Sequence, residues 1–88
     1  MYQLYKLVPK SEAYIKVTDV CMNMFQYNKY NKKYISKNGI VIFENNLLAG
    51  FCFWEEKNNS IYIQYMGVLD EYRKKGYGTI MVQWIIQS

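Results

Sequence analysis

The segment at residues 73–78, which reads RKKGYG, holds the residue types and spacing with the clearest chemical use in this chain. Its glycines, Gly76 and Gly78, let the backbone turn sharply and leave main-chain N–H groups uncovered. An apolar run at residues 79–88 predicts a helix directly afterwards, which adds the positive end of its dipole and further unpaired N–H groups. A turn of this kind can hold a phosphate or a diphosphate. The segment therefore predicts an anion site formed mainly by main-chain amides.

The spacing of this segment differs from two better-known phosphate motifs. It lacks the G-x-x-x-x-G-K-[ST] of a P-loop, and Met81 stands where the dinucleotide motif G-x-G-x-x-G has its third glycine. Taken alone, G-x-G after basic residues is also typical of a solvated turn whose lysines are surface charge. The strand-like run at 61–68 and the helix at 79–88 favour anion binding, because a strand–turn–helix arrangement directs amides at a ligand.

Composition excludes several other kinds of chemistry. The chain has no His, which removes Ser-His-Asp and Cys-His nucleophiles and His-ligated metal sites, so no metal is predicted. Cys21 and Cys52 have no CxxC spacing, and we expect them to stay reduced and pack as small apolar groups. The net charge of +4 is compatible with a solvated basic surface or with an anionic ligand near residues 73–75.

The chain is predicted to form a single domain over residues 1–88, with 51% hydrophobic residues to build its core. Its amino terminus lacks the basic-then-apolar pattern of a signal peptide. Its longest apolar run, at 47–54, is far shorter than the roughly 20 residues that a membrane-spanning helix needs. The sequence therefore predicts a soluble cytoplasmic protein with no membrane partner.

Hydrophobic periodicity predicts how the first half of the chain is organised. Alternation at 2–8 predicts a strand that Pro9 ends, and Ser11 is a predicted N-cap for a helix at 11–26. The next segment, 26–37, is rich in Tyr, Asn and Lys and reads as a loop that can include a short helix at 29–35. Its lysines are Lys29, Lys32, Lys33 and Lys37. This mixture is open to three interpretations: a solvated loop, a nucleic-acid contact without a recognised motif, or the rim of a substrate cleft.

Three further strands are predicted before the glycine turn, at 39–44, 47–55 and 60–68. Asn45-Asn46 is a two-residue turn that tolerates positive φ, and a second turn is expected at 57–59. Both faces of these strands are apolar, so the sheet should be covered on both sides. The predicted fold is α/β of the α+β kind, a mostly antiparallel sheet of about four strands flanked by helices.

At this point the chain resembles the GNAT family of N-acetyltransferases. Residues 73–78 fit every fixed position of the family's cofactor motif [RQ]-x-x-G-x-[GA]. The frequent lead-in V-x-P-x-x-R is matched at Val68 and Arg73, while Asp70 replaces the proline. The hairpin at 40–53 is similar to the second and third strands of the family, so the resemblance covers nearly the whole chain.

The resemblance implies acetyl-CoA as cosubstrate and a place for it. The amides of residues 74–79 would hold its pyrophosphate, and the backbone of residues 66–68 would pair with the pantetheine arm. Gly67 would lie at a bulge that splays this strand from its neighbour. One amide of the strand could polarise the thioester carbonyl. The implied cofactor-binding residues are Met66, Gly67, Val68, Arg73, Lys74, Lys75, Gly76, Tyr77, Gly78 and Thr79.

The implied reaction moves an acetyl group to a primary amine, on a small molecule or a peptide, by direct attack without an acyl-enzyme. A general base is then required, and Glu55, Glu56 and Glu44 are candidates by their position at strand ends. Each of these could equally be a solvated surface carboxylate. Gln64 lies where a strand carboxylate could be, but an amide cannot act as a base. No Tyr can be assigned as the acid that protonates the thiolate.

The chain departs from the family pattern at its C-terminal end, where a further strand, a helix and a hairpin are expected. Their absence would leave the strand at 60–68 as an uncovered sheet edge. We therefore expect a homodimer or a complementing chain that completes the site. The alternative is a non-catalytic remnant of the same fold that binds CoA or only a partner protein.

Overall fold

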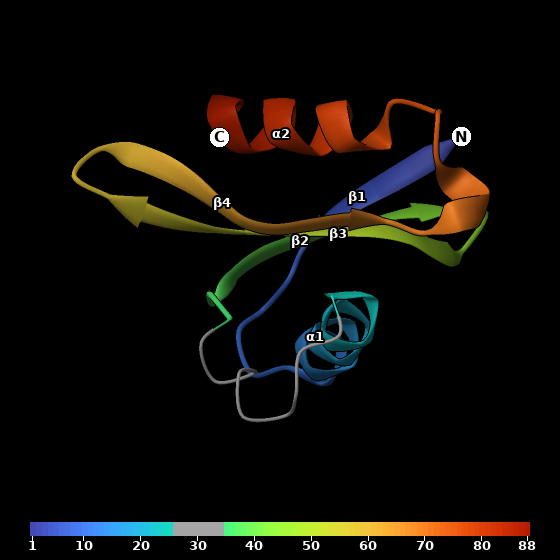
Figure 1. Ribbon diagram of the computed structural model, residues 1–88, viewed down its shortest axis with the longest axis horizontal. Helices are drawn as coiled ribbons and strands as arrows, with labels where there is room; N and C mark the ends of the chain where they lie inside the picture. Colours follow the sequence, from blue (N-terminus) through green and yellow to red (C-terminus); the bar gives the residue numbers. More distant parts are fainter. Residues whose placement is uncertain (26–34) are drawn as a thin grey trace.

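The computed structural model describes residues 1–25 and 35–88, and within them the chain forms an antiparallel sheet between two helices (Figure 1). The described elements are β1 (Tyr2–Lys6), α1 (Glu12–Phe25), β2 (Asn38–Glu44), β3 (Leu47–Lys57), β4 (Ser60–Val68), the 3-10 turn η2 (Asp70–Tyr72) and α2 (Tyr77–Gln87). The sheet has four strands in the order β1-β2-β3-β4, and each is antiparallel to its neighbours. The predicted α+β class and antiparallel meander are confirmed.

Two Asn-Asn turns join the three longer strands. Asn45 and Asn46 have φ of 53° and 67°, and Asn58 and Asn59 have φ of 51° and 63°. Positive φ at both central residues is the geometry that matches the twist of a two-residue hairpin. The first turn is as predicted. The second is one residue shorter than predicted, because Lys57 still belongs to β3.

The two helices cover opposite faces of the sheet, α1 on one side and α2 on the other (Figure 1). Alternate residues of a strand point to opposite faces, so β3 places Phe51 and Phe53 toward α1 and Cys52 toward α2. All three side chains are fully buried. A sheet covered on both sides was predicted from the apolar character of both strand faces, and the structure confirms it.

Most predicted element boundaries move by one or two residues. The Ser11 hydroxyl accepts a hydrogen bond from the Tyr14 amide at 3.1 Å, which confirms the predicted N-cap of α1. Helix α2 begins at Tyr77, two residues before its predicted start, with Gly76 as N-cap in the left-handed conformation. The predicted short helix at 29–35 and the lysines Lys29, Lys32 and Lys33 fall wholly or mainly in the segment 26–34, outside the described residues.

The bulge in β4 lies at Gln64, so its prediction at Gly67 is wrong. Phe53 pairs with Tyr65 and the next residue of β3 pairs with Ile63, which leaves Gln64 as the extra residue, while Gly67 pairs regularly with Phe51. A Cβ atom on Gly67 would lie 2.5 Å from the Met24 sulfur of α1. The same Cβ atom would lie 2.6 Å from Cζ of the fully buried Phe51 ring, so close packing under α1, and not a bulge, favours glycine at this position.

Gly50 in β3 allows the main chain of the neighbouring strand to approach closely. A Cβ atom on Gly50 would lie 2.8 Å from the main-chain oxygen of Gly67 on the neighbouring strand. The predicted close backbone approach at Gly50 is confirmed.

Candidate functional site

A groove of about 470 Å³ lies where the end of β4, the turn after η2 and the first turns of α2 meet. Its lining residues are Met66, Val68, Tyr72, Arg73, Lys74, Gly76, Tyr77, Gly78, Thr79, Val82 and Gln83. All the predicted cofactor-binding residues are among them except Gly67, which is buried against α1, and Lys75. The fold therefore brings the end of the strand and the glycine turn together around one open space.

The main-chain amides from Lys74 to Thr79 donate no hydrogen bond to any described residue. The row is bounded by the Arg73 amide, which donates to the Asp70 oxygen at 3.4 Å, and by the Ile80 amide, which donates to the Gly76 oxygen at 3.0 Å. The N-cap Gly76 has no side chain to cap these amides. Such a row of unpaired donors at the start of a helix is suited to binding an anion.

Positive φ angles shape this turn. Lys74 has φ of 68° and Gly76 has φ of 79°, and they stand on either side of Lys75. Backbone of alternating handedness curves successive N–H groups toward one concave side. Glycine adopts this conformation without strain, whereas the lysine does so at a cost of about 1 kcal/mol.

Two of the three cations before Gly76 are engaged within the protein. The Arg73 Nε atom donates to the Val68 oxygen at 3.0 Å, and its Nη1 atom pairs with Asp70 at 3.0 Å. The Lys75 ammonium group lies 2.9 and 3.0 Å from the two carboxylate oxygens of Glu44. Lys74 has no ion-pair partner among the described residues, so it is the cation that remains for a ligand.

Glu44, at the end of β2, makes a second contact with the turn. The Tyr77 hydroxyl donates a hydrogen bond to the carboxylate oxygen Oε1 of Glu44. This bond, followed by the Lys75 ammonium group, lowers the pKa of Glu44, and the same bond raises the pKa of Tyr77 to about 12. A carboxylate held ionised in this way is a weak proton acceptor, so the geometry disfavours Glu44 as a general base.

Glu55 and Glu56, the other predicted bases, lie on opposite faces of β3. The Trp54 indole N–H donates to Glu56 at 3.2 Å, on the side of α2. Glu55 accepts a hydrogen bond from Gln64 Nε2 at 3.4 Å and pairs with Lys57 at 3.1 Å. Cys52 is the β3 residue opposite Met66 of the groove, so both carboxylates lie roughly 10 Å or more further along the strand. The structure does not bring either of them into the groove.

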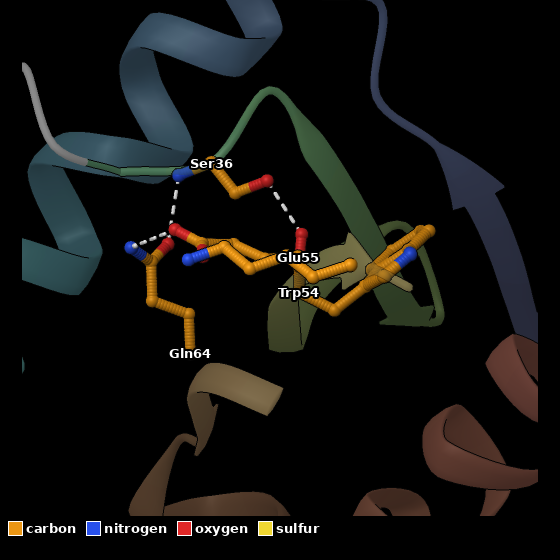
Figure 2. Close-up of polar contacts among 5 residues, drawn as sticks. Ser36, Trp54, Glu55 and Gln64 are labelled. Atoms are coloured by element: carbon orange, nitrogen blue, oxygen red, sulfur yellow. Dashed lines mark hydrogen bonds and ion pairs between the residues drawn. The ribbon is translucent and has the colours of Figure 1, made fainter. Parts of the chain in front are cut away.

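A polar cluster surrounds the bulge of β4, and Figure 2 shows its residues gathered at one point. The Ser36 amide donates to Gln64 Oε1 at 2.7 Å, and the Ser36 hydroxyl donates to the Trp54 oxygen. Gln64 thereby joins Ser36 to Glu55. The sequence pointed to Gln64 only as a residue that could not be a base, and nothing in it indicated this cluster.

Three residues of the groove were missed from sequence, namely Tyr72, Val82 and Gln83. The signal for Val82 and Gln83 was present, because they follow Thr79 at i+3 and i+4 and share one face of α2. Tyr72 carried no such signal, since its place depends on how η2 folds back before the turn.

The two cysteine thiols are unsuited to nucleophilic chemistry. Both are free and buried. Cys21 lies on α1 and faces the core between α1 and the sheet, whereas Cys52 lies on β3 and faces the core between the sheet and α2. Burial raises the pKa of the Cys21 thiol to about 11 and that of Cys52 to about 12. The prediction that they pack as reduced, apolar groups is confirmed.

The described residues hold no group of three or more His, Cys, Asp or Glu side chains placed to bind a metal ion. None of the helices in the described ranges has the length and hydrophobicity that crossing a bilayer requires.

The chain matches the model of the acetyltransferase (GNAT) family over residues 3–88, and it therefore belongs to this family. The resemblance seen in the glycine turn is thus confirmed. No curated protein sequence matches the chain.

Several solved structures are similar in fold, among them the following two. Naa50 of Arabidopsis thaliana, in complex with the bisubstrate analogue CoA-Ac-MVNAL, is 20% identical with a TM-score of 0.72, and the match covers 98% of this chain and 62% of Naa50. N-acetylglutamate synthase from Neisseria gonorrhoeae, complexed with coenzyme A and N-acetyl-glutamate, is 11% identical with a TM-score of 0.70, and the match covers 97% of this chain and 22% of the synthase. The chain thus spans less than two thirds of either protein, and the likeness shows a shared fold.

Proposed function

We propose that this chain binds acetyl-CoA in the groove beside α2 and transfers its acetyl group to a primary amine. The observation that carries the proposal is the row of unpaired amides from Lys74 to Thr79, which borders the groove. These amides suit the diphosphate of the cosubstrate, and Lys74 adds one free cation. Membership of the acetyltransferase family supports the same assignment, as does the CoA or CoA analogue bound in both similar structures.

The pantetheine arm would lie along the outer edge of β4 at residues 66–68, as an added strand does. Met66 and Val68 border the groove at this edge, and within the described residues β4 pairs only with β3. The Val68 oxygen already accepts the Arg73 Nε bond, so pairing with the arm would use the groups before it. In the reaction, the amine nitrogen attacks the thioester carbon, the C–S bond breaks, and the thiolate leaves and takes up a proton.

Of the two predicted bases that remain after Glu44, Glu55 is better placed than Glu56 to accept a proton from the amine. Glu55 is joined to Gln64 at the bulge, where the β3–β4 ladder is interrupted, whereas Glu56 lies on the α2 face and accepts the Trp54 N–H. An interrupted ladder next to the cosubstrate is where an acceptor could approach from the opposite face of the sheet. The acceptor would be a small-molecule or peptide amine.

The test is a calorimetric titration of the full chain with acetyl-CoA, followed by an assay of thiol release over a panel of amines. The buried cysteines should not interfere with a thiol reagent, because both thiols are protonated and covered. Glu55→Gln should lose most of the turnover, and the matched variant Glu56→Gln should retain it. Absence of acetyl-CoA binding would refute the proposal.

The outer edge of β4 is the place where we expect a second chain to associate. Ile61 and Ile63, which precede the residues proposed to pair with the pantetheine arm, are 40% and 42% exposed. An apolar strand edge without a neighbour favours pairing with another chain. We propose a homodimer or a complementing chain there. A monomeric molar mass, measured by light scattering at high protein concentration, would contradict this proposal.

A second candidate function is cosubstrate or partner binding without turnover. It is favoured by the distance of both carboxylates from the groove. It predicts that acetyl-CoA binds while no amine in the panel releases thiol, which separates it from the first candidate.

A further inference from the structure

Glu44 contacts the residues on both sides of Gly76. Its carboxylate binds the Lys75 ammonium group at 2.9 and 3.0 Å and accepts the hydrogen bond of the Tyr77 hydroxyl. The side chain of Glu44 is 16% exposed, although it belongs to a strand end. One carboxylate from β2 therefore joins the two residues that flank Gly76 in the candidate phosphate turn.

Gly76 is held through its main-chain oxygen, which accepts the hydrogen bond of the Ile80 amide at 3.0 Å, and it has no side chain to add a contact. Its φ is 79°, and a Cβ atom built there would meet nothing within 4 Å. Glycine loses more conformational freedom on ordering than any other residue. The side-chain contacts that keep this turn in one shape must therefore come from its neighbours, and both neighbours reach the same carboxylate.

The charge of Glu44 is otherwise unfavourable at this position. A carboxylate beside an anion site repels the ligand, unless its charge is balanced locally. Lys75 provides that balance, and its ammonium group also lies 5.6 Å from the centre of the Tyr72 ring. The pairing uses up the Lys75 cation, which does not line the groove.

We propose that Glu44 is a positioning residue that holds the turn at 74–79 in its binding shape before the cosubstrate arrives. This inference rests on the proposed function, because the benefit appears as affinity for a diphosphate. A site ordered in advance avoids the entropy of ordering during binding. Glu44 acts here through Lys75 and Tyr77 and does not touch the ligand.

The test compares Tyr77→Phe and Glu44→Gln with the wild-type chain. Tyr77→Phe removes only the hydroxyl, because its ring is 6% exposed and stays packed edge-on against Tyr2. Tyr2→Phe is the matched control, since it removes a nearby hydroxyl from a 43% exposed ring. NMR titrations would follow CoA and pantetheine, which lacks the diphosphate, and relaxation measurements would give order parameters for the ligand-free turn.

Tyr77→Phe should bind CoA about 5- to 10-fold more weakly, as expected for losing a hydrogen bond to a charged group. Glu44→Gln should also bind CoA more weakly, because the loss of the turn's shape outweighs the release of the Lys75 cation. Pantetheine binding should stay within about twofold, and backbone order parameters in the turn should fall below about 0.8. The double variant should be no weaker than Glu44→Gln, because both changes act through one carboxylate. Tyr2→Phe should match the wild type.

The outcomes separate this inference from the proposed function. A wild-type chain that fails to bind CoA overturns both. A wild type that binds, with variants of equal affinity and unchanged order parameters, overturns the role of Glu44 alone. Equal losses for CoA and pantetheine would mean that Glu44 only supports the fold, and would also overturn it.

Discussion

Replacing Gly76 by aspartate should separate charge from shape at the candidate phosphate site. A Cβ atom at this position meets nothing within 4 Å, so the first atom of a new side chain has room there. The φ of 79° is strained for most residues but best tolerated by Asn and Asp. We expect Gly76→Asp and Gly76→Asn to fold, each with a loss of unfolding free energy of about 1 kcal/mol. The two side chains have nearly the same shape and differ in one negative charge.

The magnitude follows from Coulomb's law. Unit charges about 5 Å apart repel by roughly 0.8 kcal/mol in water and roughly 3 kcal/mol at an effective dielectric constant of about 20. A diphosphate carries at least two such charges, so repulsion from the aspartate is about 1.6 kcal/mol even at the solvated limit. That corresponds to about a 15-fold weaker affinity for acetyl-CoA in Gly76→Asp than in Gly76→Asn.

Calorimetry of the wild type and both variants, at low and at moderate salt, is the assay. The difference between the Asp and Asn variants should shrink as salt rises, because screening weakens the repulsion. Equal affinity of the two variants at low salt would refute the placement of the diphosphate at this turn. Thermal unfolding of both variants confirms that the comparison is made on folded protein.

The remaining predictions concern packing, reactivity and charge. Gly67→Ala should lower the unfolding free energy by about 1–3 kcal/mol in denaturant titrations, because its Cβ would lie 2.5 Å from the Met24 sulfur. The two buried cysteines, with thiol pKa values of about 11 and about 12, should not react with a thiol reagent at pH 8 until denaturant is added. Lys74→Met should reduce the salt dependence of acetyl-CoA binding, because Lys74 has no ion-pair partner among the described residues and is left to face the ligand, as titrations at several salt concentrations would show. The pKa of Glu44 is lowered in the folded chain from its ordinary 4.5. The contribution of this carboxylate to stability is therefore present above pH 4.5 and is lost as the pH falls through the folded-state pKa. The difference in Tm between wild type and Glu44→Gln should shrink as the pH is lowered from 4.5 through the folded-state pKa.

Local signals explain why so much of the fold could be predicted. The hairpin at Asn45-Asn46 follows from a residue type that accepts positive φ, and the strands around it follow from their alternation. The start of α1 follows from the hydroxyl of Ser11. In each case the cause lies within a few residues of the effect. The glycine turn is also determined locally, because Gly76 and the helix that follows it set the backbone conformation of the turn itself.

The features that were missed depend on contacts between distant segments. Whether the extra residue of β4 falls at Gln64 or at Gly67 is decided by the register with β3, and by the Met24 side chain that closes over Gly67. The bridge from Glu44 to Lys75 joins residues that are 31 positions apart. No pattern within β2 marks Glu44 as anything other than a strand-end carboxylate.

The charges of the turn lead to a further consequence for the candidate site. Because Arg73 is engaged by Val68 and Asp70, and Lys75 by Glu44, the net positive charge left for a ligand is small. Attraction at the groove must then come mainly from dipoles of main-chain amides, whose strength depends on direction and not on ionisation. Changes that redirect these amides should therefore reduce binding more than changes that remove a lysine. Basic residues in this turn act first as parts of its scaffold, and only Lys74 is available to act as a counter-charge.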